Sequence, residues 1–234
     1  MRLNVISTLD AINSVIGVDL LGQSLLPAVI ELAQDSKWRI RLAVLENIPV
    51  LAKHFGVDFF NDKLVSLCTK WLIDDIHSIR KAAAVNFKKL TDLFGEGWVT
   101  KEITPKIEKM HLSTAYSQRM TCCYVLQLII PELTTSTIGS VALPIVTALA
   151  GDAVANIRFS VAKTIHAAVT TLNKRLSRST GAAPERELMS KLDPILSMLC
   201  EDSDRDVRFY AEKVSRNLKS KADSVASANV SHFL

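Results

Sequence analysis

Two stretches of the chain share the pattern that decides the fold: DSKWRIRLAVLENIPVLAKHFG at residues 35–56 and DDIHSIRKAAAVNFKKLTDLFG at residues 74–95. In each stretch an Asp is followed six residues later by an Arg, then by apolar residues at helical spacing, and finally by a Gly. The arginine recurs at intervals of 39, 39, 39 and 50 residues, as Arg41, Arg80, Arg119, Arg158 and Arg208. Self-similarity at a period of about 40 residues is typical of helical repeat proteins.

The Asp of this pattern is also periodic, although a Ser replaces it in the third repeat. The column reads Asp35, Asp74, Ser113, Asp152 and Asp202. An Asp directly before a helix can accept hydrogen bonds from the first helical N–H groups, and its charge suits the positive end of the helix dipole. We therefore expect the Asp to cap the helix that carries the Arg.

The residues after each Arg predict the second helix of a two-helix unit. Apolar residues stand seven and fourteen positions after the Arg, as at Ile48 and Phe55, and this spacing forms one face of an amphipathic helix. The next position holds Gly17, Gly56, Gly95 or Asn173. These residue types tolerate the left-handed conformation that ends many helices, so the second helix is expected to end there.

A shorter apolar segment before each Asp predicts the first helix of the unit. Four repeats carry a proline in it, at Pro27, Pro105, Pro144 and Pro194. Two short helices cannot bury their apolar faces alone, so successive units must stack on one another.

The predicted fold is therefore all-α, an α-solenoid with one leading helix plus five helix pairs. The solenoid is expected over residues 1–220. Its repeats are expected at residues 1–17 (partial) and at about 20–56, 60–95, 99–134, 138–173 and 188–220. Residues 172–187 are polar and basic and predict an inserted surface loop, and residues 221–234 predict a flexible tail.

Composition excludes several classes of protein. The chain has 48% hydrophobic residues, 28 Lys plus Arg and 24 Asp plus Glu, which excludes disordered and fibrous classes. The net charge of +4 is spread along the sequence, so no nucleic-acid partner is expected. No apolar run reaches 18 residues, and no membrane partner is expected.

The chain shows no signature of an enzyme, a metal site or a cofactor site. Its five histidines form no ligand pair, and no phosphate-binding glycine loop or nucleophile motif occurs. The cysteines are Cys68, Cys122, Cys123 and Cys200, and none has metal-ligand spacing. Reduced, mostly packed thiols are expected, which indicates a cytoplasmic and nuclear location.

The turns between the paired helices are the candidate functional surface. Three residues before the first three arginines stand Trp38, His77 and Tyr116, so ring side chains occupy the same place in successive turns. Two interpretations are open: the rings anchor a protein partner, or each ring packs over the adjoining turn and seals the solenoid.

The Asp-x4-apolar-Arg signature between two helices resembles the HEAT repeat. In that family the turn Asp and the helix Arg form a ladder from one repeat to the next. The resemblance implies a structural ladder of Asp35, Arg41, Asp74, Arg80, Asp152, Arg158, Asp202 and Arg208.

Residues 24–57, 67–90 and 144–165 resemble, as whole segments, the C-terminal repeats of the scaffold (A, regulatory) subunits of protein phosphatase 2A. The resemblance implies a non-catalytic scaffold that binds the phosphatase catalytic subunit through its intra-repeat turns. It implies binding of regulatory B subunits only together with the missing N-terminal repeats. The implied partner-binding residues are Lys37, Trp38, Arg39, His77, Tyr116, Arg119, Val154 and Asn156.

Arg119 belongs to two predictions at once, because the repeat register also makes it a ladder residue. With Ser113 in place of the turn Asp, we expect Arg119 to be freer than the other arginines to face a partner.

Alternatives stay open at this point for the function of the chain and for the role of one segment. The chain can be a HEAT-repeat scaffold for another client, such as a nuclear-transport or chromosome-associated partner, or an enzyme accessory with redox-active thiols. The 172–187 segment can be a regulatory loop, phosphorylated at Ser177 or Ser179, or a tolerated insertion.

Overall fold

The computed structural model describes residues 18–178 and 183–216. The partial repeat expected at residues 1–17 and the tail expected at residues 221–234 lie outside the described residues. The described part of the chain is helical and contains no strand. It divides into two compact units, unit 1 (Met1–Ile107) and unit 2 (Glu108–Leu234).

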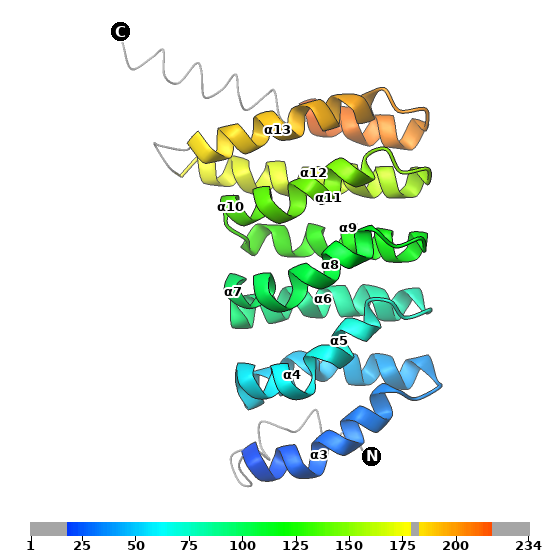
Figure 1. Ribbon diagram of the computed structural model, residues 1–234, viewed down its shortest axis with the longest axis vertical. Coiled ribbons are helices and arrows are strands. Elements are labelled where there is room, and N and C mark those ends of the chain that lie inside the picture. Colours follow the sequence, from blue (N-terminus) through cyan, green and yellow to red (C-terminus); the bar gives the residue numbers. More distant parts are fainter. Residues whose placement is uncertain (1–17, 179–182, 217–234) are drawn as a thin grey trace. The chain divides into compact units, whose positions relative to one another are not determined.

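Within each unit, helix pairs stack in chain order, as Figure 1 shows. This is the all-α solenoid architecture that the 39-residue period predicts. The first helix of a pair is called the upstream helix here, and the second, which carries the Arg, the downstream helix.

The described part of unit 1 begins with the upstream helix α3 (Val18–Ala33), which packs on α4 (Trp38–Lys63). α5 (Val65–Trp71) packs on α4 and on α6 (His77–Phe94), and α4 and α6 pack on each other. α7 (Glu96–Trp98) and the π-helix η1 (Val99–Ile103) follow, and α8 (Thr104–His111) includes the boundary between the units.

Unit 2 contains the downstream helix α9 (Tyr116–Ile129), the 3-10 turn η2 (Ile130–Glu132), α10 (Thr135–Thr137) and the π-helix η3 (Ile138–Ala142). The upstream helix α11 (Leu143–Leu149) precedes the downstream helix α12 (Ala155–Leu176). α13 (Ala183–Cys200) and a helix over residues 205–216 form the last pair. α12 packs on α9, α11 and α13.

Glycines with positive φ angles lie at two of the predicted helix ends. Gly56 and Gly95 have φ angles of 77° and 82°, a region that L side chains rarely adopt. Gly56 interrupts α4, and Gly95 follows the last residue of α6. The prediction for Asn173 is wrong, because α12 continues to Leu176, and Gly17 lies outside the described residues.

Two of the four prolines of the upstream helices follow wider backbone turns, whereas Pro27 and Pro194 lie inside α3 and α13. π-helical turns end two residues before Pro105 and Pro144. A proline has no N–H to donate and its ring clashes with the preceding helical turn, so local widening relieves the conflict.

The predicted surface loop at residues 172–187 is much shorter in the structure. α12 extends through residue 176 and α13 begins at residue 183, so helix covers both ends of the predicted loop. The sequence suggested a loop because the segment is polar and basic. Lys174 in α12 and Arg186 and Glu187 in α13 are exposed on helices whose other side is buried at Leu172 and Leu188.

The core consists of the periodic apolar columns. The residues seven positions after Arg41, Arg80, Arg119 and Arg158 are fully buried: Ile48 and Phe87 in unit 1, and Leu126 and Ile165 in unit 2. Cys122 and Cys123 are also fully buried, as expected for core thiols. Each fully buried side chain of this size contributes about 1.5–3 kcal/mol through removal of apolar surface from water.

Two-pronged ion pairs join consecutive repeats within each unit. In unit 1, Arg41 donates from Nε and Nη2 to the carboxylate of Asp74 at 3.2 and 3.0 Å. In unit 2, Arg119 pairs with Asp152 at 2.6 and 3.1 Å, and Arg158 pairs with Asp202 at 2.6 and 2.8 Å. Each carboxylate therefore belongs to the repeat after that of its arginine.

Each of these arginines also holds the turn of its own repeat. Arg41 Nη1 donates to the carbonyl of Asp35 at 2.8 Å, and Arg158 Nη1 donates to the carbonyl of Asp152 at 2.7 Å. One guanidinium thus fixes the turn before its helix and the turn of the next repeat.

The Asp residues do not cap the helices in the expected way. Helices α4, α6 and α12 have Lys37, Ile76 and Val154 at the N-cap, without a side-chain cap hydrogen bond. The Asp two residues earlier accepts instead from the N–H of the N-cap residue, at 2.7 Å for Asp35 and 2.9 Å for Asp152. The Asp therefore shapes the turn, and the charge-assisted bond to Arg adds to this role.

The direction of these pairs corrects the expectation for Arg119. Its carboxylate partner is Asp152, so the Ser at position 113 leaves Arg119 fully engaged. The residue 33 positions after Arg80 is Ser113, which has no carboxylate. Arg80 donates from Nη1 to the carbonyls of Asp74 and Asp75, and its buried Nε has no hydrogen-bond partner among the described residues.

Removal of one ladder carboxylate is expected to destabilise the fold. Asp152→Ala should lower the free energy of unfolding by about 1–3 kcal/mol, because it leaves a largely buried Arg119 without its carboxylate and the Val154 N–H without its acceptor. Asp92→Ala is the control, since Asp92 forms an exposed pair with Lys88 and should cost less than about 1 kcal/mol. Urea unfolding measures both, and equal effects of the two variants would contradict a structural role for Asp152.

Stability should also depend on the charge of Asp202. The hydrogen bond from Arg158 lowers the pKa of Asp202, against the opposing effect of burial. A lowered folded-state pKa stabilises the fold at pH values above the unfolded value of about 3.9, and this contribution is lost as the pH falls through the folded value. The gap in unfolding free energy between the wild type and Asp202→Asn should be constant from about pH 7 to pH 5 and narrow below about pH 4. Urea unfolding across this range tests the expectation, and a gap that stays constant down to about pH 2 would rule it out.

Candidate protein-binding surface

The first turn of unit 1 presents two cations beside a ring. Lys37 and Arg39 are exposed, and Trp38, the first residue of α4, is partly exposed. The guanidinium carbon of Arg39 lies 4.6 Å from the centre of the Trp38 ring, which is a cation–π contact. Hydrogen bonds of Asp35 and Arg41 fix the backbone of this turn. The side chains of Lys37, Trp38 and Arg39 therefore extend from a rigid backbone.

Trp38 differs from a tryptophan that seals a core. Trp71 in the same unit is 3% exposed, and its indole N–H donates to the carbonyl of Ala33 at 3.3 Å. Trp38 keeps part of its ring in solvent and has Arg39 over it. This arrangement favours an anchor for a partner over a sealing role.

The second turn of unit 1 carries His77, which is exposed and begins α6. Ile73, just before the turn Asp, is 49% exposed. The structure thus adds an exposed apolar side chain to a turn that the sequence analysis described only by its His.

In unit 2 the turn before α9 carries two exposed apolar side chains. Tyr116 is 57% exposed and Leu112 is 76% exposed. Leu112 lies 39 residues after Ile73 and one residue before the turn, so the repeat register could have identified both. The sequence does not predict Ile73 and Leu112 as surface residues, because the equivalent position in the other repeats holds Gln34, Gly151 and Glu201. A position that is apolar in only two of five repeats does not form a recognisable pattern.

The remaining expected contact residues divide into two groups. Val154 is partly exposed and Asn156 is exposed at the start of α12, so both are accessible. Arg119 is not: its side chain is 15% exposed, and its bonds go to Asp152 and to the carbonyls of Ser113 and Thr114. Arg119 therefore belongs to the ladder and is not freer than the other arginines, contrary to expectation.

Three of the four thiols are poorly placed for redox chemistry. Cys68, Cys122 and Cys123 are buried, and none of the four cysteines forms a disulfide in the described part of the chain. Burial raises the pKa of the Cys68 and Cys122 thiols and raises that of Cys123 to about 12, so the reactive thiolate is scarce at neutral pH.

Two further classes of site are absent from the described residues. No group of three His, Cys, Asp or Glu side chains there could hold a metal ion. Residues 18–178 and 183–216 also include no helix of the length and apolarity needed to cross a bilayer.

Comparison with known proteins agrees with the repeat assignment. The HEAT repeat family matches residues 25–55. The regulatory A subunit of protein phosphatase PP2A from Saccharomyces cerevisiae is 40% identical to this chain over 128 residues, which is 54% of the chain and 19% of that protein. The match therefore spans about one fifth of the yeast protein. Together these findings support a HEAT-repeat scaffold.

Similar solved structures agree on the fold. A designed armadillo repeat protein in complex with the peptide (KR)4 has a TM-score of 0.50 at 15% identity, with 92% of each chain covered. A second designed armadillo repeat protein also has a TM-score of 0.50 at 15% identity, covering 93% of this chain and 97% of its own. Both are helical repeat solenoids, and at this identity the likeness concerns the fold alone.

Proposed function

We propose that this chain belongs to the scaffold (A) subunits of protein phosphatase 2A and binds the phosphatase catalytic subunit through its intra-repeat turns. The observation that carries the proposal is the 40% identity over 128 residues to the regulatory A subunit of the yeast phosphatase. In this role the chain is a regulatory protein without catalytic activity of its own. Contacts with regulatory B subunits would need repeats beyond those in this sequence.

The chemistry of the turns supports a protein partner. In unit 1, Lys37 and Arg39 flank the partly exposed Trp38 in the first turn, and His77 in the second turn is exposed, so all three cationic or ring side chains can offer hydrogen-bond donors. In unit 2, Tyr116 and Leu112 provide apolar area in the turn before α9, and Val154 and Asn156 are accessible in the turn before α12. Aromatic and Arg side chains dominate the binding energy of many protein interfaces, and the rigid turns reduce the entropy that binding costs.

The proposal is tested by titrating the purified catalytic subunit of protein phosphatase 2A into this chain in a calorimeter. We expect a complex of one to one stoichiometry. Trp38→Ala should weaken it by roughly 30-fold, because truncation of a central aromatic anchor typically costs about 2 kcal/mol. Tyr116→Ala should also weaken it, and since the Tyr116 ring is 57% exposed, this change should leave the melting temperature almost unchanged.

Leu93→Ala is the matched control. Leu93 is 43% exposed and lies near the end of α6, far in sequence from either turn, so its truncation should leave affinity unchanged. Wild-type affinity in both ring variants would exclude the turns as the interface. A markedly lower melting temperature with normal affinity in Trp38→Ala would show that this ring seals the fold.

A further inference from the structure

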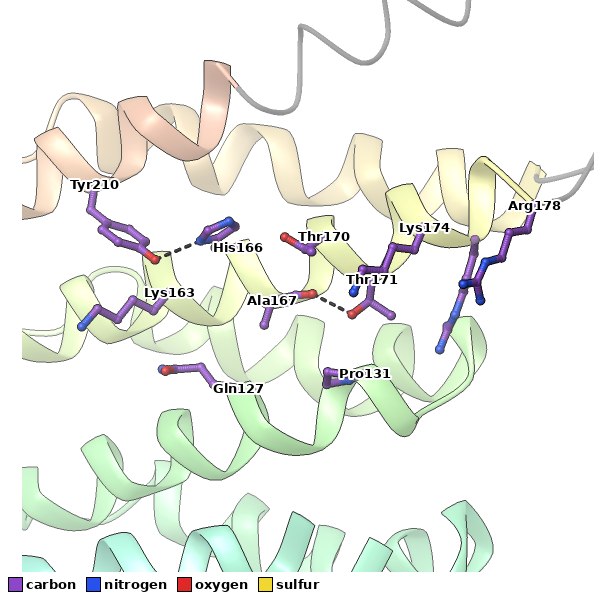
Figure 2. A pocket seen from close by; sticks show the side chains of 11 residues that line it. Gln127, Pro131, Lys163, His166, Ala167, Thr170, Thr171, Lys174, Arg178 and Tyr210 are labelled. Carbon is purple, nitrogen blue, oxygen red and sulfur yellow. Dashed lines mark hydrogen bonds between the residues drawn. The ribbon is translucent and has the colours of Figure 1, made fainter. Parts of the chain in front are cut away.

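A groove in unit 2 lies on a surface that the intra-repeat turns do not include. It has a volume of about 510 Å³ and follows α12, with Gln127 of α9 on one flank and Tyr210 of the last helix on the other. Figure 2 shows Lys163 and Tyr210 at one end, and Lys174 and Arg178 toward the other. None of the proposed phosphatase contacts lines it.

The groove is strongly cationic. Four of the side chains that line it are Lys163, Lys174, Arg175 and Arg178, and none of the described side chains that line it is a carboxylate. Arg175 is partly compensated, because it donates to the Leu133 carbonyl and to Thr135 Oγ1, and Thr135 in turn donates to Glu185. These hydrogen bonds fix the position of the Arg175 guanidinium in the groove wall.

The other three cations have no such compensation. Lys163 lies 4.2 Å from the centre of the Phe159 ring, a contact that orients its ammonium without neutralising it. Lys163, Lys174 and Arg178 form no ion pair with any carboxylate of the described chain. Three uncompensated cations along one groove produce a positive potential that attracts an anionic ligand.

The middle of the groove is polar and uncharged. The Tyr210 hydroxyl lies 2.9 Å from His166 Nδ1. Burial and then the nearby Lys213 lower the pKa of His166, and burial raises the pKa of Tyr210, so both groups are neutral near pH 7. The protonated phenol can then donate to Nδ1, which leaves the imidazole proton on Nε2.

The dimensions favour an extended peptide. Positions 163, 166, 170 and 174 recur on one face of α12, and eleven residues of helix separate Lys163 from Lys174, a rise of about 17 Å. Extended chain advances about 3.3 Å per residue, so roughly five residues span the two lysines and about seven reach Arg178. A compact anion such as a single phosphate would engage only one end.

The chain's own C-terminal segment does not have the charge to fill the groove. Residues 217–234 contain two Lys and one Asp. A second copy of the chain, with a net charge of +4, is disfavoured for the same reason.

We propose that the groove along α12 binds an extended acidic segment of a partner protein, with carboxylates near both ends of about seven residues. Lys163 meets one end, Lys174 and Arg178 meet the other, and Gln127, His166 and Tyr210 offer hydrogen bonds to the backbone between them. This site shares no residue with the intra-repeat turns, and the proposal does not depend on which protein binds the turns.

The probe for the test is a fluorescent, end-blocked heptapeptide with Glu at its first two and last two positions. Its binding to the whole chain is followed by fluorescence anisotropy in about 50 mM salt, where charge interactions are least screened. The same peptide with Gln in place of Glu should not bind. The double variant Lys174→Glu/Arg178→Glu should bind the acidic peptide about tenfold or more weakly, since two attractive contacts become repulsive.

The matched control is Lys101→Glu/Lys106→Glu, which changes the net charge equally at two exposed lysines outside the groove. It should retain near wild-type affinity. An equal loss in both double variants would mean that only the overall charge attracts the peptide, and absence of wild-type binding would also overturn the proposal. Tighter binding of a single-stranded oligonucleotide of equal charge, lost in the groove variant, would assign the groove to a nucleic acid instead. Because the readout is a synthetic peptide, its failure is separate from failure of the phosphatase proposal.

Discussion

The pairing of each ladder Arg with the Asp of the next repeat constrains the rest of the structure. Arg41, Arg119 and Arg158 each use two nitrogens for that carboxylate and a third for a carbonyl in the turn of their own repeat. The Asp in turn accepts from the N-cap N–H of its own downstream helix, as at Val154. Backbone polar groups of the turns are thereby satisfied, and the partly exposed side chains that follow need no partners from the core.

This arrangement separates the two candidate surfaces. The surface at the turns consists of the first residues of the downstream helices, such as Trp38 in unit 1 and Asn156 in unit 2. The groove uses the later part of α12, where the 3.6-residue period brings Lys163 and Lys174 to one face. Because their apolar sides are buried, downstream helices can vary in their exposed polar residues with little cost to stability, so one helix can contribute to two binding sites.

The sequence was sufficient for features that repeat and insufficient for those that occur once. The 39-residue register identified the buried columns at Phe87 and Ile165 and the helix end at Gly95. It did not reveal which carboxylate an Arg meets, because the same-repeat and next-repeat Asp recur with equal regularity. The expectation that Ser113 leaves Arg119 freer than the other arginines is therefore wrong. The polarity of residues 172–187 predicts a loop, but residues 172–176 and 183–187 lie in helices α12 and α13. The groove depends on residues about 40 positions apart, Gln127, Lys163 and Tyr210, which share no motif.

A double-mutant cycle in unit 1 tests the ladder most directly. The variants Arg41→Met, Asp74→Ala and their combination are unfolded in urea, and the coupling is the difference between the double effect and the sum of the single effects. Because the pair has two hydrogen bonds at 3.2 and 3.0 Å and both side chains are less than one fifth exposed, we predict a coupling of about 1–2 kcal/mol. Additivity within about 0.3 kcal/mol would contradict the claim that this pair joins the repeats.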